Sequence, residues 1–404
     1  MWIYLLRHEK IIVVTVIVGL LLGFFYLFWS TKDLVYEEDH TRQDKLYDIT
    51  NAQLIGYEEG KKKFSISAEN VYARHDLNRP QFVTINAGVF YDKKKTFSLQ
   101  GLRARKGAYD SYNKNVDLSG AVSGTLIYTK DTDQKRMRFT SGSLHHEDRA
   151  QLSELAGSVT LHDKKNKLTA GKMTVFHASE KAHFIPPITV HGDKHTLSAL
   201  SMVYDFNSNV LKAQDDVIFS HTDVHTKEKA KLKTTRLTVT DFDKDGRSID
   251  FPEPVHIYQK NKYATAKYAT YDEETEVLAL HDKAHITFKR LGPLLSDGEE
   301  EVDESEMGFS LNRKTDLDAD FIKINNKNGN FYATGNVVVK QLFHEGTSQE
   351  AIYFKEEEKL VFIGDVHFKK VGGQEIQADT ITFFLDTKTY EAEGMVETDV
   401  IINR

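Results

Sequence analysis

The sequence predicts an all-β protein, an extended β-jelly roll built of two-strand repeats and preceded by one N-terminal transmembrane helix. Three features predict this fold: a long apolar run near the N-terminus, apolar residues that alternate through the rest of the chain, and a motif that returns roughly every 30 residues. Alternation is the two-residue period of a strand with one buried face, and no helical period is sustained after the apolar run.

The composition excludes several classes of function. The chain has 404 residues and is 40% hydrophobic, so it can bury a core. It carries 53 basic and 60 acidic residues and a net charge of -7, which gives no basic excess for holding nucleic acid. It contains no cysteine, which excludes disulfides, zinc-thiolate sites and thiol catalysis.

The N-terminal apolar run predicts a membrane anchor. Residues 11–29 contain Thr15 as their one polar side chain apart from the Tyr26 hydroxyl, and their length suits a helix that crosses a bilayer. Bulky aromatic residues lead directly into Ser30, unlike the small residues of a signal cleavage site, so we expect the anchor to stay uncleaved. Arg7 and Lys10 place the tail, residues 1–10, in the cytoplasm. A buried core helix is the weaker alternative for residues 11–29. We expect residues 30–45 to form a polar tether after the anchor.

The repeat has two recurring marks. One is a small residue after an apolar-x pair, and the other is a Gly-x-Val sequence in a second alternating run, with polar turn residues between the two. The small residues are Ala104, Ser141, Ala170, Ala199, Ala266, Ala319 and Ala378, and the glycines are Gly120, Gly157, Gly335, Gly364 and Gly394. Each unit therefore predicts two strands, and neighbouring units must close over one another to bury their apolar faces as a sandwich or jelly roll.

Two segments interrupt the repeat. Residues 291–308 form an acidic loop between units, which predicts a solvated excursion more than an ion site. Residues 241–246 begin like a calcium-binding loop, but Pro252 stands at the twelfth position, where such a loop has its glutamate. The segment falls where the repeat has a turn, so we expect an Asp-Gly hairpin.

No catalytic or metal-binding constellation departs from the repeat. The sequence lacks the serine-nucleophile, phosphate-loop and zinc-protease motifs. Three histidine pairs have a spacing of four, but no carboxylate accompanies them in a ligand pattern, so surface or hydrogen-bonded histidines are favoured: His191 with His195, His221 with His225, and His281 with His285. We therefore expect no enzyme activity, no metal and no cofactor.

The apolar face of the repeats is the candidate binding site. One interpretation is an ordinary β-sandwich core, and the other is a partly open gutter that holds acyl chains. The residues expected to line it are Tyr109, Val122, Val159, Tyr204, Val217, Tyr271, Val337, Phe362, Val366, Phe368 and Val396.

Both ends of a repeat stack present strands with unpaired backbone groups, which can pair with another protein. Ile49 and Leu54 mark the first edge, next to the tether, and Val400 and Ile402 mark the last. We expect these residues to lie in the docking strands.

Short motifs resemble the lipopolysaccharide-transport families. Residues 330–339, with Leu317–Asp320 upstream, are similar to the OstA/LptA repeat, and the anchor followed by residues 64–69 and 79–83 resembles the start of LptC. The resemblance implies an LptC-like jelly roll over 46–191 and an OstA/LptA-like jelly roll over 192–404. It further implies a periplasmic location beyond the inner membrane and lipopolysaccharide held by its acyl chains. The partners that it implies are an inner-membrane ABC exporter and a further jelly-roll protein, either LptA-like or an LptD-like outer-membrane translocon.

The residues and the resemblance together predict a non-enzymatic lipid conduit. A conduit for phospholipid, a ligand-free β-solenoid scaffold and, more weakly, a polysaccharide-lyase type enzyme remain as alternatives.

Overall fold

The computed structural model describes residues 45–74, 76–92, 96–222, 228–244, 246–289, 313–342, 344–370, 374–387 and 389–400. The regular secondary structure of these residues consists of β-strands, which confirms the all-β prediction for them. No helix among them is long and apolar enough to cross a membrane. The predicted tail, transmembrane helix and acidic loop lie outside the described residues, as does the tether except for Lys45.

The described residues divide into two compact units. The small unit contains residues 45–48, 72–74 and 76–77, and the large unit contains residues 49–71 and the described residues from 78 onward. In the small unit, the amide of Leu46 donates to the carbonyl of Ala73 at 2.7 Å. The candidate site lies in the large unit.

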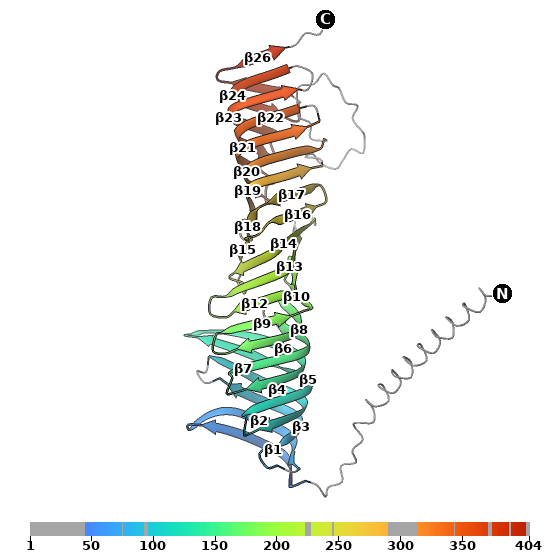
Figure 1. Ribbon diagram of the computed structural model, residues 1–404, viewed down its shortest axis with the longest axis vertical. Coiled ribbons are helices and arrows are strands. Elements are labelled where there is room, and N and C mark those ends of the chain that lie inside the picture. The colour runs from blue at the N-terminus through green and yellow to red at the C-terminus, as the bar shows by residue number, and fades with distance from the viewer. Residues whose placement is uncertain are drawn as a thin grey trace, which may run out of the picture. The chain divides into compact units, whose positions relative to one another are not determined.

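The strands form one sheet of 26, and all the pairings with a defined register are antiparallel. The strands, coloured in chain order in Figure 1, are β1 (Tyr47–Glu58), β2 (Lys61–Ala73), β3 (Gln81–Tyr91), β4 (Phe97–Asp110), β5 (Asn115–Lys130), β6 (Asp133–Glu147), β7 (Leu152–His162), β8 (Lys167–Phe176), β9 (Lys181–Ile185), β10 (Ile188–His191), β11 (His195–Ala199), β12 (Ser201–Asp205), β13 (Val210–Thr222), β14 (Lys229–Thr240), β15 (Ser248–Phe251), β16 (Val255–Gln259), β17 (Lys262–Ala266), β18 (Tyr268–Asp272), β19 (Val277–Phe288), β20 (Thr315–Asn325), β21 (Phe331–Gln341), β22 (His344–Phe354), β23 (Lys359–Lys370), β24 (Gln374–Phe384), β25 (Thr389–Glu393) and β26 (Glu397–Val400).

The sheet folds into two walls. The first half of β13 pairs with β12 and its second half with β11, and β24 likewise pairs with both β25 and β26. We call the wall with β9, β12, β15, β18 and β25 the first wall, and the wall with β10, β11, β16, β17 and β26 the second wall. Most long strands contribute one half to each wall, so the apolar faces of the two walls meet and enclose the core.

The Gly-x-Val sequences mark the corner where a strand passes from one wall to the other. In β21, Gly335 (φ 78°) and Asn336 (φ 49°) are both left-handed, and the pairing register shifts between Thr334 and Val337. Such a bulge bends a strand without ending it. The alternation resumes beyond the bend, so the strand continues into the second wall.

At some corners glycine also leaves space for a neighbouring side chain. A Cβ atom on Gly335 would lie 2.5 Å from Oδ2 of Asp320, and one on Gly364 would lie 2.9 Å from the side chain of Gln349. The following residue also contacts Asp320, since the side-chain amide Nδ2 of Asn336 donates to Oδ2 of Asp320 at 2.7 Å. β13 makes the same bend without glycine, with Asp215 (φ 60°) and Asp216 (φ 50°).

Some of the small residues of the repeat lie opposite a corner valine. Val159 pairs with Ala170 and Val366 with Ala378, and all four are buried. Because the two walls converge at the corner, a larger side chain opposite the valine would overfill it. At these corners the small residue and the Gly-x-Val valine of the repeat therefore pack against each other.

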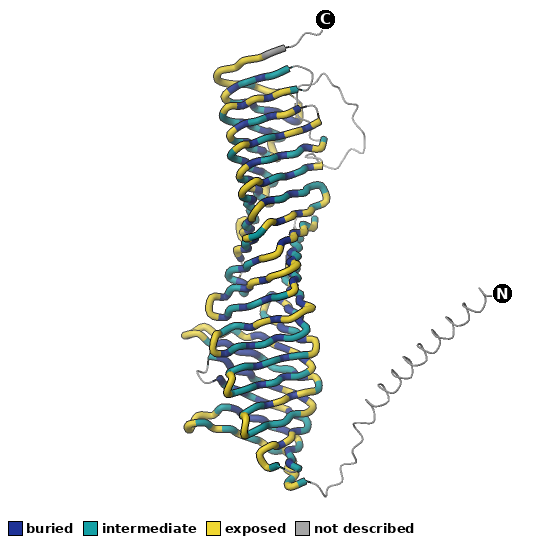
Figure 2. Tube along the Cα trace, in the orientation of Figure 1, coloured by how far each residue is buried: buried dark blue, intermediate teal, exposed yellow. Residues whose placement is uncertain are grey.

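The walls meet again on the side opposite the corner, where their turns face each other, and we call this line the seam. In β5, Tyr128 reaches Glu180 in the turn before β9, whereas in β23 Phe368 contacts Phe383 in the next strand. Near β5 the seam therefore joins strands that are several strands apart in chain order, and near β23 it joins strands that follow one another. Figure 2 shows buried residues alternating with exposed ones along the strands of the large unit.

Candidate functional site

Most of the predicted lining residues lie in the interior between the walls. Nine of them are buried, each with 5% or less of its surface exposed: Val122, Val159, Tyr204, Val217, Tyr271, Val337, Phe362, Val366 and Phe368. The valines follow the corner bends, and the aromatic residues lie farther along the walls. These positions show that the residues share the apolar interior, while their contact with lipid stays a prediction.

Two predicted lining residues differ from the others. Tyr109 is half-buried, at the end of β4, and its ring packs on Phe64 with centroids 4.8 Å apart. Val396 is 47% exposed, so its expected place on the buried face is wrong. The physical reason is that Gly394 to Val396 separate β25 from β26 at the last corner, where no later described strand packs over them.

A cavity of about 60 Å³ lies between the walls in the middle of the large unit. Its apolar lining comes from both walls, with Leu232, Ile257 and Ile286 on the second wall and Leu278 and Ile324 on the first. We call this space the central cavity. An apolar space with a few polar groups at one side is typical of ligand sites.

Polar side chains lie at the seam side of the central cavity. His221, Gln259 and Lys262 come from the second wall, and Asn326 lies in the turn after β20. The Tyr271 hydroxyl is 3.5 Å from Nε2 of His221, which joins the walls across the seam. A lipid with its chain in this cavity would therefore place its polar end at the seam.

A second cavity of about 60 Å³ lies near the start of the large unit. Phe64, Phe90, Tyr109 and Val116 supply its apolar lining. Lys63 and Lys114 reach Glu58, at 3.2 and 2.6 Å, and this pairing lowers the pKa of Glu58, the hydrogen bond from Lys114 being the largest cause. Both cavities have an apolar interior with charged or polar groups at one side.

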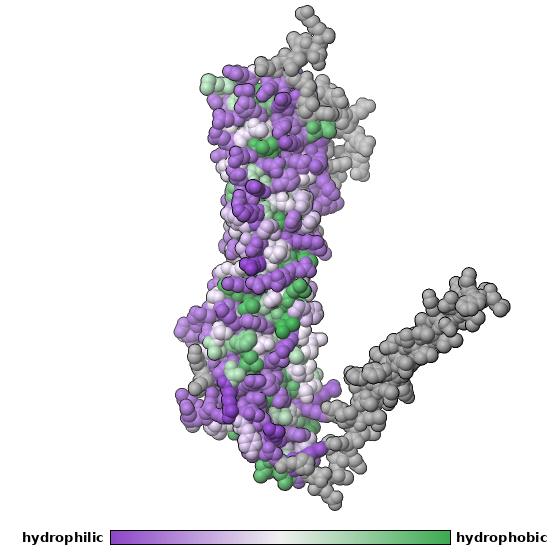
Figure 3. Space-filling view, viewed as in Figure 1, coloured by the Kyte–Doolittle hydropathy of each residue, from purple (hydrophilic) through white to green (hydrophobic). Residues whose placement is uncertain are grey.

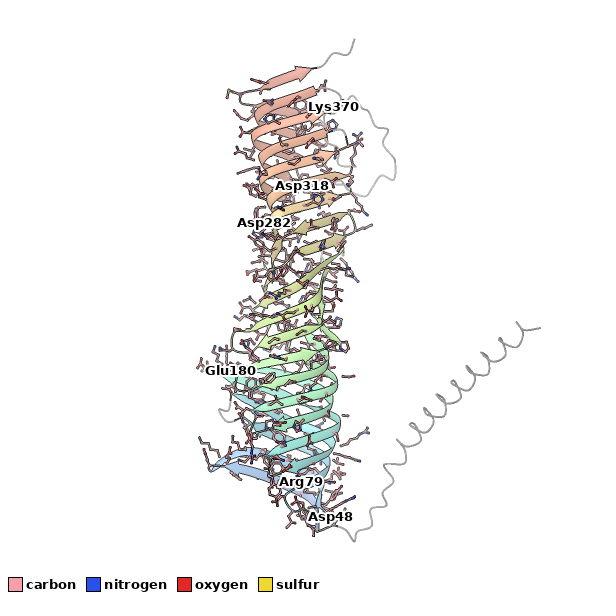
Figure 4. The ribbon with its side chains drawn as sticks, viewed as in Figure 1. Asp48, Arg79, Glu180, Asp282, Asp318 and Lys370 are labelled. Atoms are coloured by element: carbon pink, nitrogen blue, oxygen red, sulfur yellow. The ribbon has the colours of Figure 1, made fainter. Side chains whose placement is uncertain are left out.

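An aromatic block fills the interior between the two cavities. Phe97 from the second wall meets Phe206, which lies in the turn after β12 of the first wall, at a centroid distance of 5.0 Å. Tyr128 packs on Phe97 and donates its hydroxyl to Glu180 at 2.9 Å, and burial together with this carboxylate raises the pKa of Tyr128. Glu180 projects at the edge of the sheet in Figure 4. This contact closes the seam over the block.

The Tyr204 ring belongs to the same interior. Its hydroxyl donates to Oδ1 of Asn209 at 2.8 Å, and its ring contacts Phe206 and Phe242. Burial is the largest cause that raises the pKa of Tyr204, so the phenol stays neutral and its ring adds to the apolar surface.

Arg247 forms a buried polar cluster beside the central cavity. It is 6% exposed and lies just before β15, and its Nε donates to Glu273 at 2.9 Å. Its Nη1 donates to Asn166 at 3.2 Å and to Nε2 of His195 at 2.9 Å. Asn166 and His195 belong to the second wall, so Arg247 fastens the seam. The sequence did not indicate this role, because its partners lie 26 to 81 residues away with no shared motif.

Two buried histidines share one hydroxyl in the first wall. Nδ1 of His146 is 2.8 Å from Oγ of Ser153, which is 2.9 Å from Nε2 of His177. Burial lowers the pKa of His146 to about 3 and that of His177 to about 4, so both rings are neutral near pH 7. Ser153 is fully buried, which leaves no space for a substrate at its hydroxyl.

The other predicted histidines that the structure describes are exposed or half-buried. His191 is exposed, and Nδ1 of His285 lies 2.7 Å from Oδ1 of Asp318, which is labelled in Figure 4. His225 lies outside the described residues. In the described part of the chain, no three His, Cys, Asp or Glu side chains are grouped to hold a metal.

Three of the four predicted docking residues are described, and they lie in β1 and β26. In β1, Ile49 is exposed and Leu54 is half-buried. Val400 pairs with Gln374 through β26, and Ile402 lies outside the described residues. Their contact with partner proteins stays a prediction.

The N-terminal part of the chain matches a protein family. Residues 14–193 match the family described as "Lipopolysaccharide-assembly, LptC-related". This segment is similar to the LptC-related family. The match confirms the resemblance to LptC for these residues, and by its description the LptC family acts in lipopolysaccharide assembly. The sheet continues beyond residue 193, because β10 pairs with β11 across the expected domain boundary at 191/192. The division into two jelly rolls at that boundary stays a prediction.

The solved structures that are similar to part of the chain include one of a lipopolysaccharide-transport protein. It is the crystal structure of LptH from Pseudomonas aeruginosa, described as the LptA-homologous periplasmic component of the lipopolysaccharide transport device. The identity is 12%, the TM-score is 0.21, and the match covers 36% of this chain and 81% of LptH. No curated protein sequence matches the chain.

Proposed function

We propose that the chain is a membrane-anchored conduit for lipopolysaccharide. The acyl chains would lie between the two walls, and the polar headgroup would lie outside the seam. Residues 11–29 would hold the protein in the inner membrane, with the described sheet in the periplasm. An ABC exporter would deliver the lipid near β1, and a further jelly-roll protein would receive it beyond β26.

The central cavity is the observation that carries this proposal. Its interior is apolar on both walls, and its polar side chains are gathered at the seam. An amphiphile has the same division, so the cavity suits one whose chain enters from the seam and whose headgroup stays outside. The LptC-related segment at residues 14–193 supports lipopolysaccharide as that amphiphile.

The walls must separate for the lipid to enter. A cavity of about 60 Å³ is much smaller than a fatty acyl chain of a dozen carbons. Separation along the seam breaks side-chain contacts, such as that of Tyr271 with His221 at 3.5 Å, whereas separation at the corner would break the continuous backbone hydrogen bonding of the bent strands. The seam is therefore the proposed route of access.

Photo-crosslinking in cells tests the conduit. A photoreactive residue in place of Leu232, which is buried in the central cavity, should capture lipopolysaccharide. The same residue in place of Lys212, which is exposed on the outer face of β13, is the control and should capture little. Capture of phospholipid at Leu232 would replace the proposed ligand, and capture from Lys212 alone would contradict the conduit.

A cross-link across the seam tests the route. The chain has no cysteine, so His221→Cys with Tyr271→Cys introduces one pair for a short bismaleimide. Tying the walls should abolish lipid capture at position 232. The matched control is Lys212→Cys with Thr238→Cys, which ties two neighbouring strands of the first wall and should leave capture unchanged.

A further inference from the structure

The outer face of the strands that line the central cavity carries cations and aromatic rings. In β14, Lys229, Lys231 and Lys233 are exposed, while Ala230 and Leu232 between them line the cavity. Alternation along a strand causes this, since successive side chains point to opposite faces of the sheet. The same short segment therefore presents an apolar surface inside and a cationic surface outside.

Two tyrosines extend this outer surface across the next strands. Lys231 lies opposite Tyr258 in β16, and Tyr258 lies opposite Tyr263 in β17. The rings of Tyr258 and Tyr263 are 5.2 Å apart, and Nζ of Lys233 is 5.8 Å from the Tyr258 ring centre. Tyr258 is 42% exposed, so its ring is accessible from solvent. We call Lys231, Lys233, Tyr258 and Tyr263 the basic-aromatic patch.

The patch is cationic within an acidic protein. The chain has a net charge of -7, yet the cross-strand neighbours of the two lysines are all uncharged or basic types: Ile218 and His256 beside Lys233, and Ser220 and Tyr258 beside Lys231. Figure 3 shows how polar and apolar side chains are distributed over one face of the molecule. Lysines without an acidic cross-strand neighbour can bind a phosphate, and exposed tyrosine rings can stack on the apolar faces of sugars.

We propose that the basic-aromatic patch binds the phosphorylated sugar headgroup of the amphiphile whose acyl chain occupies the central cavity. This inference rests on the proposed function and adds a headgroup site to it. Tyr258 is next to Gln259, which lines the cavity at the seam, and one strand residue spans about 3.3 Å. A headgroup that leaves the cavity at Gln259 and Lys262 can therefore turn over the end of the second wall and reach the patch.

Binding to the full-length chain in lipid nanodiscs tests the headgroup site. Three probes separate the possible sources of binding: lipopolysaccharide, its deacylated phosphorylated oligosaccharide, and inorganic phosphate. Lys231→Gln with Lys233→Gln should weaken lipopolysaccharide binding by about tenfold, the loss expected for a charge-assisted phosphate contact. Tyr258→Ala with Tyr263→Ala should weaken lipopolysaccharide and oligosaccharide alike and leave phosphate unchanged.

A matched control comes from the first wall. Lys212→Gln with Tyr268→Ala removes one exposed lysine and one exposed tyrosine from the other wall and should leave all binding unchanged. If the wild-type chain binds lipopolysaccharide and the patch variants bind it equally well, the headgroup site is wrong and the conduit stands. If the wild-type chain does not bind lipopolysaccharide, the conduit itself is wrong. Binding of inorganic phosphate as tightly as of the oligosaccharide would overturn sugar recognition.

Discussion

Nη1 of Arg247 lies 2.9 Å from Nε2 of His195, and this contact joins the two walls across the seam. A guanidinium only donates hydrogen bonds, so Nε2 of His195 accepts and the ring proton lies on Nδ1. Nδ1 is 3.7 Å from Glu273, the carboxylate that pairs with Arg247. Burial, followed by the charge of Arg247, lowers the pKa of His195 to about 4, which keeps the ring neutral and able to accept.

Arg247→Met should destabilise the large unit strongly. The change leaves the Glu273 carboxylate without its partner in a mostly buried site, and loss of one member of such a pair costs about 3–5 kcal/mol. The measurement is the urea midpoint of the full-length chain. Lys244→Met is the control, since Lys244 lies in the same turn and pairs with Asp241 in solvent. Equal midpoints for the two variants would contradict the fastening role of Arg247.

Acid should weaken the fold through His177. Its pKa is about 4 in the folded chain, below the ordinary histidine value of about 6.5, because burial disfavours the charged ring. Its stabilising effect is complete above pH 6.5 and is lost as the pH falls towards 4, because the unfolded chain binds the proton first. The loss amounts to about 3 kcal/mol.

His177→Gln tests this source of acid sensitivity. The variant should show a flatter dependence of the urea midpoint on pH between 6.5 and 4, because glutamine does not titrate. His191→Gln, at the exposed end of β10, should keep the wild-type slope. A wild-type slope in the His177 variant would assign the acid sensitivity to other groups.

The corner glycines should differ in how much they tolerate a side chain. Gly335 and Gly101 both have a positive φ, but a Cβ on Gly335 would meet Asp320, whereas one on Gly101 would meet nothing within 4 Å. Gly101→Ala should therefore cost about 1 kcal/mol, the price of the backbone conformation alone. Gly335→Ala should cost clearly more. Urea midpoints check the difference, and partial rescue of Gly335→Ala by Asp320→Gly would identify the clash as its cause.

The strand content could be predicted from the sequence, because a strand with one buried face leaves a two-residue period. Alternation places Phe362 and Val366 inside, and the pairing of Val366 with Ala378 explains two marks of one repeat. The bend itself was not predicted, since the alternation of β23 continues on both sides of Gly364 and Asp365. The seam could not be predicted either, because Arg247 and Asn166 are 81 residues apart and meet only in the folded sheet.

The last prediction concerns the C-terminal edge. β26 pairs with Gln374–Gln377 of β24 on one side, and no further described strand pairs with its other side. Successive residues of an antiparallel strand point their N–H groups to opposite sides, so one of Asp399 and Val400 donates toward β24 and the other toward the free edge.

Proline at each position removes one of these two donors. If a further jelly-roll protein docks by adding a strand, the variant that removes the free-edge donor should block delivery of lipopolysaccharide to the outer membrane while the urea midpoint stays unchanged. The proline variant that removes the donor facing β24 should mainly loosen β26 from β24. Faster hydrogen exchange at the amides of Gln374–Gln377 would report this loosening. Normal outer-membrane lipopolysaccharide with both variants would exclude docking through β26, because an added strand needs the donors on that edge.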